Sequence, residues 1–252
     1  MQDGREFTKK RFAELAGICV SSGIFTFTDF LGLDELSLFE EVKRELSGVK
    51  YTLFGGAHGT ERVMVRFGDP EELGWCEDFP IAVIEASPRA AKWADKLTHR
   101  DLLGAIMNLG VERSFIGDIA IIENVAYIFV KESLATFIEE NLTRAKHTDL
   151  TVKRVTEIPV GELYKTEKIT VQCSSVRLDS VIARAFCLSR EEAQLTVEKG
   201  LAFIDGRLCQ SPSREPKDGQ TVSVRGRGRF VYRGVTGTTK KGQLNVSLEL
   251  YV

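Results

Sequence analysis

A capping signal at Ser189 divides residues 176–230 into two short predicted helices. Ahead of it, four apolar residues recur at the spacing of a single helix face: Leu178, Ile182, Ala185 and Phe186. Glu192 stands three residues after Ser189, which is the spacing of a capping box, and Ala193 and Val197 supply the inner face of the second helix. Because a three-residue corner joins the two helices, this stretch predicts a helix-turn-helix unit.

A glycine and two hairpin signals follow the second helix. Gly200 suits the left-handed position just past a helix end. Asp205 and Gly206 form the dipeptide that two-residue primed turns prefer. Residues 231–235 and 244–250 then alternate in polarity like the strands of a closing hairpin. The pattern predicts a small antiparallel sheet beside the helix-turn-helix.

Charge is distributed unevenly along the chain. Residues 168–252 contain 14 Lys and Arg against 8 Asp and Glu, a net charge of +6. The first 167 residues contain 20 basic against 28 acidic residues, a net charge of −8. The formal charge of −2 for the whole chain therefore hides a basic C-terminal part, which favours a polyanionic partner such as RNA.

Polar and basic residues around the predicted helix-turn-helix are the candidate RNA contacts. Cations at a helix corner and in loops can grip a phosphate backbone by charge and shape, and the alternative is that each is an ordinary solvated surface charge. The predicted contacts are Arg177, Arg184, Ser189, Arg190, Lys199, Arg207, Arg225, Arg227 and Arg229. The secondary candidates are Arg62, Arg100, Arg113, Lys240 and Lys241.

Residues 1–76 predict a small α/β domain. One helix carries an inner face of Phe12, Leu15 and Cys19, and Ser37 with Glu40 could cap a second helix. Residues 51–54 and 63–67 alternate like strands, and the glycine-rich residues 55–62 lie between them. We favour a tight connection for this loop. An RNA contact through Arg62 is the second alternative, and a nucleotide site is the least favoured because the phosphate-binding lysine motif is missing.

Residues 77–160 predict a ferredoxin-like (RRM-like) β-α-β-β-α-β domain. Expected strands lie at 81–86, 118–122, 125–130 and 150–155, with helices after the Thr98/Asp101 cap and at 133–142. Tyr127 and Phe129 alternate on a central strand, where they could stack on RNA bases. Packing into the core is the favoured alternative, because the RNA-recognition signature is absent. Residues 156–175 are interpreted as a short ordered linker, with one strand expected at residues 166–171, that leads to the basic domain at 170–252.

Signals for catalysis or metal binding are weak. Residues 99–101 imitate part of a kinase catalytic loop, but the Asn that should follow Asp101 by five residues is absent. His99 and Asp101 stand two apart at a helix start, where they point apart rather than forming an acid–base pair. The five cysteines and three histidines lack metal-ligand spacing. We expect no enzyme activity, no cofactor and no metal.

The basic part of the sequence resembles a known RNA-binding module. The matching motifs are Arg177-Leu178-Asp179, Leu188-Ser189-Arg190 with Ala193, Lys199-Gly200-Leu201 and Ile204-Asp205-Gly206. In this order they resemble the S-four RNA-binding domain over about 55 residues. Glu191 with Glu192, and Asp205 in place of the usual Asn, depart from that pattern by adding negative charge.

Motifs in the first 120 residues resemble the YlmH family. They are Phe27-Thr28-Asp29-Phe30-Leu31, the Gly55–Arg62 loop, Leu97 to Ala105, Leu109-Gly110-Val111 with Arg113, and Ile116 to Ile119. The resemblance implies a cytoplasmic bacterial factor that binds ribosomal RNA and tRNA on the large ribosomal subunit carrying a peptidyl-tRNA. The implied role is quality control of stalled translation, and a link to cell division has also been suggested for the family.

The sequence as a whole predicts an α+β, non-enzymatic RNA-binding protein. No apolar run reaches the ~18 residues of a membrane span, and residues 1–6 lack a signal-peptide pattern. We therefore expect a cytoplasmic protein, and we expect a monomer. One alternative is an RNA-modifying enzyme, a pseudouridine synthase or methyltransferase tethered by the S-four module. Another is a protein-interaction scaffold whose acidic part meets ribosomal proteins.

Overall fold

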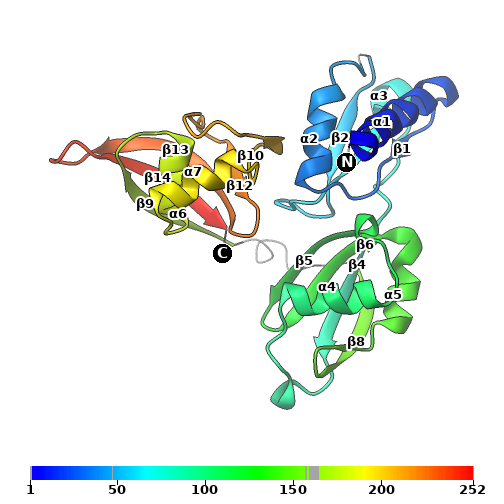
Figure 1. The fold of residues 1–252 in the computed structure, drawn as a ribbon. Coiled ribbons are helices and arrows are strands. Elements are labelled where there is room, and N and C mark those ends of the chain that lie inside the picture. Colours follow the sequence, from blue (N-terminus) through cyan, green and yellow to red (C-terminus); the bar gives the residue numbers. More distant parts are fainter. Residues whose placement is uncertain (1, 47, 157, 159–164, 252) are drawn as a thin grey trace. The chain divides into compact units, whose positions relative to one another are not determined.

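The computed structural model describes residues 2–46, 48–156, 158 and 165–251. The chain forms two compact units, Met1–Tyr164 and Lys165–Val252 (Figure 1). Its mixture of helices and antiparallel strands is that of an α+β protein, as predicted. In the described part of the chain no helix combines the length and apolar character needed to cross a membrane.

The N-terminal part of the first unit is a three-stranded sheet covered by helices. Its elements are α1 Gln2–Ser22, β1 Thr26–Phe27, α2 Leu33–Val42, β2 Tyr51–Phe54, β3 Met64–Phe67 and α3 Pro70–Leu73. The strand order is β1-β3-β2 with both pairs antiparallel. Phe12 of α1 meets Phe39 of α2 edge-to-face at 5.4 Å between ring centroids, and both are buried. The predicted inner face of the first helix is therefore confirmed.

The predicted cap of the second helix is wrong. Helix α2 begins at Leu33, so Ser37 and Glu40 lie inside the helix and Ser37 is buried. Gly32 is the N-cap residue, and the Glu35 carboxylate accepts a hydrogen bond from its backbone N–H at 3.0 Å. Since glycine has no side chain to cap with, the reciprocal half of the capping box alone marks this helix start.

The central part of the first unit is a five-stranded sheet with two α-helices, in the chain order β4-α4-β5-β6-α5-β7-β8. Its elements are β4 Ile81–Pro88, η1 Ala91–Trp93, α4 His99–Asn108, η2 Arg113–Phe115, β5 Ile116–Ile122, β6 Val125–Lys131, η3 Glu132–Leu134, α5 Ala135–Asn141, β7 Arg144–Ala145 and β8 Thr148–Val155. The antiparallel strand order is β5-β6-β4-β8-β7. Alternate residues of β4 and β6 pack against α4 and α5 in one core, which contains Ile84, Ile128, Ile106 and Ile138.

Local signals in this part are confirmed. Thr98 and Asp101 form a capping box at the start of α4. Glu123 and Asn124 both have positive φ angles, 48° and 67°, and make the two-residue turn between β5 and β6. Both positions of a type I′ turn require such angles, so the connection matches the predicted hairpin.

The second unit packs two helices on a six-stranded antiparallel sheet. Its elements are β9 Thr166–Cys173, α6 Leu178–Ala185, α7 Arg190–Glu198, β10 Ala202–Ile204, β11 Arg207–Leu208, β12 Thr221–Val224, β13 Gly228–Thr238 and β14 Leu244–Tyr251. The strand order is β11-β10-β12-β13-β14-β9. The strand expected at residues 166–171 is confirmed as β9, and it pairs along its whole length with β14, from Cys173↔Leu244 to Thr166↔Tyr251. This part of the expected linker therefore belongs to the sheet.

Candidate nucleic-acid interface

The corner between α6 and α7 is built by local hydrogen bonds. Ser189 Oγ accepts from the Glu192 N–H at 3.1 Å, and the Glu192 carboxylate accepts from the Ser189 N–H at 2.9 Å. Hydrogen bonding of the Glu192 carboxylate to the backbone N–H and the side chain of Ser189, helped by the charge of Arg227, lowers the pKa of Glu192. Cys187 turns the chain with a φ of 53°, and Leu188 N–H donates to the Ala183 carbonyl at 2.8 Å. The predicted capping box is confirmed, and the corner consists of residues 186–189, one residue more than predicted.

Packing turns the polar face of α7 outward. Ala193 and Val197 are fully buried in the same core as Leu178 and Ile182 of α6. Arg190 is the first residue of α7 and Lys199 directly follows its last, and both are exposed. At 1.5 Å per residue, these two cations lie roughly 14 Å apart along the helix axis. Helix α7 therefore presents one exposed cation at each end.

The hairpin after α7 has the predicted primed turn. Asp205 and Gly206 have φ angles of 49° and 76°, and Ile204 pairs with Arg207 across the turn. The Asp205 carboxylate accepts from Gln220 Nε2 at 2.7 Å and from the Thr221 N–H at 2.8 Å. Asp205, which replaces the usual Asn of the S-four pattern, thus ties the turn to the start of β12. Arg207, on the other side of the turn, is exposed.

Arg225 and Arg227 lie in the connection from β12 to β13, and Arg229 is the second residue of β13. The Arg225 N–H donates to the Leu201 carbonyl at 2.9 Å, and its guanidinium lies 5.7 Å from the Phe203 ring centroid. Arg227 lies close enough to Glu192 for its charge to lower the pKa of that carboxyl. The Arg229 guanidinium stacks over Tyr251 at 4.0 Å. Arg227 therefore lies beside the start of α7.

Arg177 serves the fold of the helix-turn-helix. Its Nε and Nη2 atoms donate to the two carboxylate oxygens of Asp179 at 3.1 and 2.8 Å, and Asp179 is completely buried. Burial alone would raise the pKa of Asp179, but the bonds from Arg177 and Ser180 and the charge of Arg190 outweigh it and lower that pKa. Arg184 is exposed in the last turn of α6. An RNA contact by either arginine stays a prediction.

Lys240 and Lys241 lie in the exposed turn between β13 and β14. Strand β13 runs for 11 residues from Gly228, beside the arginine-rich connection, to Thr238. At about 3.3 Å per residue this places the two lysines roughly 30 Å along the strand from that connection. The fold therefore separates them from the cations around α7.

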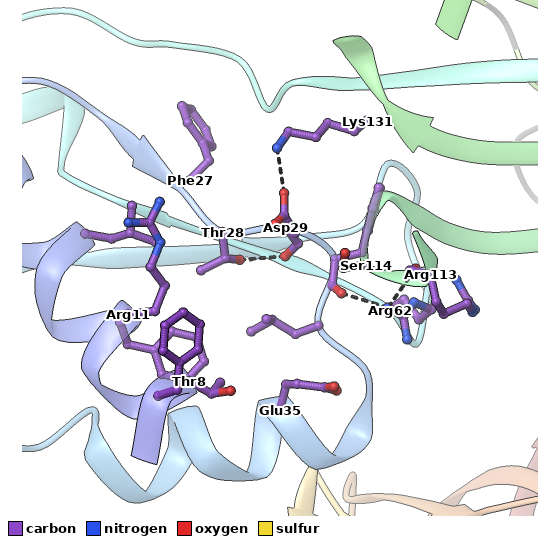
Figure 2. A pocket seen from close by; sticks show the side chains of 15 residues that line it. Thr8, Arg11, Phe27, Thr28, Asp29, Glu35, Arg62, Arg113, Ser114 and Lys131 are labelled. Carbon is purple, nitrogen blue, oxygen red and sulfur yellow. Dashed lines mark hydrogen bonds and ion pairs between the residues drawn. The ribbon is translucent and has the colours of Figure 1, made fainter. Parts of the chain in front are cut away.

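Arg62 lies half-buried in the first unit, where its guanidinium holds backbone carbonyls together (Figure 2). Nε donates to the Ile116 carbonyl at 2.9 Å, and Nη2 donates to the Phe30 carbonyl at 2.7 Å and the Arg113 carbonyl at 3.3 Å. The backbone N–H groups of Glu61 and Arg62 donate to the Asp118 carboxylate at 2.7 and 3.0 Å. The glycine-rich loop is therefore a tight connection fixed to β5, and Asp118 gave no local signal of this role.

Arg113 lies beside Arg62 at a pocket of about 410 Å³ (Figure 2). Its Nη1 donates to the carbonyls of Ile116 and Gly117. Burial, together with the neighbouring charge of Arg62, lowers the pKa of Arg113 to about 10. At another wall of the pocket Lys131 donates to Asp29 at 2.6 Å. The RNA contacts predicted for Arg62 and Arg113 stay predictions, and in this structure both guanidinium groups bind backbone carbonyls.

Phe129 is a core residue, as the favoured interpretation predicts. It is fully buried with Phe30 and Met64 against the N-terminal part of the unit. Gly56 approaches its ring so closely that a Cβ atom there would stand 2.3 Å from Phe129 Cδ1. Base stacking on Phe129 would require these two parts to separate.

In the described residues no group of three or more His, Cys, Asp and Glu side chains is arranged to hold a metal ion.

Arg100, the remaining secondary candidate, is exposed in the first turn of α4. His99 precedes it, and burial and the charge of Arg113 lower the pKa of His99.

Comparison with known proteins identifies the family. Residues 75–158 match the family described as "Putative RNA-binding domain in YlmH". The chain is 30% identical over 233 residues to the Ribosome-associated protein quality control protein P2 of Bacillus subtilis (strain 168), covering 88% of this chain and 86% of that protein. The chain belongs to the YlmH family. A solved structure, "Cell division protein ylmH from Streptococcus pneumoniae", is 21% identical, with a TM-score of 0.47, covering 60% of this chain and 90% of that one. The family resemblance inferred from the motifs is confirmed.

Proposed function

We propose that this YlmH-family protein is a non-enzymatic RNA-binding factor of ribosome-associated quality control. It docks on ribosomal RNA and tRNA of a large subunit that carries a stalled peptidyl-tRNA, and it acts in the cytoplasm as a monomer. The observation that carries the proposal is that this chain exposes several cations around α7. The chain is also a relative of a protein named for ribosome-associated quality control. The match of residues 75–158 to a domain described as RNA-binding supports it.

The proposed chain organisation has three domains. Residues 1–76 form the N-terminal domain, residues 77–160 a ferredoxin-like RNA-binding domain, and residues 170–252 an S-four-type domain. In the last of these, Arg190, Lys199 and Arg227 are the primary phosphate contacts, because they surround α7 and belong to an exposed surface. Ser189 adds a contact at the helix corner. Arg184, Arg207, Arg225 and Arg229 extend the charged surface.

Phosphate contacts of this kind give a steep salt dependence. Each neutralised phosphate releases condensed counterions, so the logarithm of affinity falls by roughly 0.7–0.9 per phosphate for each tenfold rise in salt. About five contacts then correspond to a slope of about −4. A binding constant that does not change with salt would contradict a grip on the phosphate backbone.

The deciding experiment is sedimentation of the full-length protein with purified bacterial large ribosomal subunits. The test variant is Arg190→Glu/Lys199→Glu, in which both exposed ends of α7 reverse charge. Arg177→Glu is unsuitable because it would leave the buried Asp179 carboxylate without its partner. We expect the wild type to travel with the subunits and the test variant to remain in the supernatant.

The matched control is Lys165→Glu/Lys168→Glu. It makes the same change in net charge within the same unit, at the exposed start of the edge strand β9. Near wild-type sedimentation of this control, with loss for the α7 variant, assigns binding to the helix-turn-helix. Equal loss in both variants would reduce the interaction to net charge and overturn the assignment to α7. Incubation of the bound RNA with a labelled methyl donor, and analysis for pseudouridine, test the absence of RNA modification.

A further inference from the structure

The acidic first unit contains one end that is locally basic. Residues 89–101 and 144–149 together hold six basic against three acidic residues. The rest of the first 167 residues holds 14 basic against 25 acidic, a net charge of −11. We name this region the cationic end, and its basic members are Arg89, Lys92, Lys96, Arg100, Arg144 and Lys146.

The fold brings the two segments of the cationic end together. The last residue of β4, Pro88, pairs with Leu150 of β8, and the Arg89 N–H donates to the Asp149 carbonyl at 2.9 Å. The Asp95 N–H donates to Thr148 Oγ1 at 3.0 Å. The loop from β4 to α4 therefore packs on the start of β8, although about fifty residues separate them in the sequence.

A groove of about 530 Å³ lies at this end, between α4 and the connection from α5 to β7. Arg100, Arg144 and Lys146 line it, together with the amide side chains of Asn108 and Asn141. Cations that can bind phosphate oxygens and amides that can bond to sugar or phosphate are the side chains that contact nucleic-acid backbones. The groove thus has the composition of a backbone site.

Of the three acidic residues of the cationic end, Asp101 is held within the fold by hydrogen bonds, and Asp95 and Asp149 approach the cations only loosely. The Asp101 carboxylate accepts from the backbone N–H of Thr98 at 2.9 Å and its hydroxyl at 2.6 Å, and these bonds lower the pKa of Asp101. Lys146 approaches Asp95 only to 4.0 Å. Arg144 approaches Asp149 only to 3.9 Å. Pairs this loose, between side chains that are 36–69% exposed, leave the cations able to turn toward a phosphate.

The same sheet has its other end covered. This end consists of the start of β4, at Ile81, and the end of β6, at Phe129 and Lys131. Phe30 of the N-terminal part packs in one cluster with Phe129, and Gly56 lies against Phe129 and Ile81. Strand β4 spans eight residues from Ile81 to Pro88, roughly 25 Å. RNA that approaches the cationic end therefore meets its basic residues and does not need to reach Phe129, which is covered by the N-terminal part.

We propose that the central domain binds a second stretch of RNA phosphate backbone at the cationic end, in the groove between α4 and the connection from α5 to β7. This inference rests on the proposed function, because it requires the protein to dock on RNA. Two separated grips on one RNA raise the affinity beyond that of either alone, since the second binds as an intramolecular event. The proposed site lies at the edge of the domain. It differs from the mode of an RRM, in which RNA binds on the exposed face of the sheet.

The test measures binding to purified bacterial large ribosomal subunits and to their protein-free RNA, over a range of KCl concentrations. The test variant is Arg100→Glu/Lys146→Glu, and the second is Lys92→Glu/Lys96→Glu, which tests the same end without touching the groove lining. The matched control in the same unit is Lys10→Glu/Arg44→Glu, which reverses two exposed cations of the N-terminal part. Tryptophan fluorescence checks folding, because Trp75 and Trp93 both lie in the first unit.

We expect both cationic-end variants to bind subunits and protein-free RNA at least tenfold more weakly than wild type. The salt slope should become shallower by about 1.5, the value for two lost phosphates. The control should match the wild type. Wild-type affinity and slope in the folded cationic-end variants would overturn this site while leaving the α7 grip intact. Loss on subunits with unchanged binding to protein-free RNA would identify a ribosomal protein as the partner and also overturn it. A wild type that binds neither probe would overturn the proposed function itself.

Discussion

Two pairs of basic residues in this molecule look alike in the sequence but differ in their burial and hydrogen bonding. Arg62 and Arg113, in the first unit, are half-buried and donate to the carbonyls of Phe30, Ile116 and Gly117. Arg190 and Lys199, in the second unit, are exposed at the two ends of α7. All four are predicted RNA contacts. The difference shows that tertiary hydrogen bonding, which the sequence does not display, decides whether a cation is available to a partner.

Burial has an electrostatic cost for the first pair. Removing a guanidinium from water disfavours its charged form, and the neighbouring charge of Arg62 adds to this effect at Arg113. The pKa of Arg113 is accordingly lowered to about 10. The carbonyl dipoles around both groups offset part of that cost. Arg190 and Lys199 are exposed in the free protein and keep their hydration until a phosphate replaces it.

The largest effect should come from removing a buried guanidinium. Arg62→Ala leaves the carbonyls of Ile116 and Phe30 without this donor, and we expect the first unit to lose about 3–4 kcal/mol of stability. Urea unfolding followed by tryptophan fluorescence measures this, since both tryptophans lie in that unit. At low denaturant, ribosome binding should stay near wild type. Loss of binding by a folded Arg62→Ala protein would break the comparison.

The second prediction concerns the close approach of Gly56 to Phe129. Gly56→Ala must accept a φ of 99° and place a Cβ 2.3 Å from the Phe129 ring, so we expect a loss of about 3 kcal/mol. Gly104→Ala is the control, because Gly104 lies in α4 without a positive φ, and a Cβ added there would have nothing within 4 Å. There alanine should stabilise the helix by up to ~1 kcal/mol. Equal effects of the two substitutions would show that the two parts do not pack at Phe129.

Short-range signals predicted the fold well where the chain forms its own contacts. The capping boxes at Thr98 and Ser189 and the turn at Asp205 each depend on residues within a few positions, and all three are confirmed. These signals also set the exposed ends of α7, so a large part of the proposed interface follows from local pattern.

Long-range contacts are what the sequence could not show. The sequence predicts a strand at residues 166–171 but not its pairing, because the partner strand β14 follows about seventy residues later. The bonds from Arg62 to Phe30 and Ile116 span 32 and 54 positions. A count of charges treats such an arginine and an exposed one as equal. The cationic end is likewise assembled from two distant segments, and only their packing reveals it.

The third prediction uses the buried ion pair of the second unit. The folded-state pKa of Asp179 lies below its usual value, so this carboxylate stabilises the fold above about pH 4, the ordinary pKa of an unfolded Asp. That stability is lost as the pH falls through the lowered folded-state pKa. Asp179→Asn should cost roughly 2 kcal/mol at pH 7, because Arg177 loses its charged partner.

Calorimetry of both proteins between pH 7 and pH 2 checks this prediction. The wild type should lose its advantage over Asp179→Asn below about pH 4, as its carboxylate takes up a proton. A difference in melting temperature that stays constant across this range would show that ionisation of Asp179 does not stabilise the unit. Tryptophan fluorescence should not respond to the substitution, because the second unit contains no tryptophan.

The smallest expected effect sharpens the comparison most, because it separates binding from stability at a single residue. Arg190→Ala removes one exposed cation beside the capping box of α7. We expect the affinity for large subunits to fall about fivefold, which is about 1 kcal/mol, and the salt slope to become shallower by less than one. Stability should stay within about 0.5 kcal/mol, as for other surface substitutions. Arg177→Ala provides the contrast, since it should destabilise the second unit through Asp179 whether or not RNA is present. If Arg190→Ala instead destabilised the unit and left the salt slope unchanged, Arg190 would belong with the buried arginines, and the distinction between the two pairs would fail.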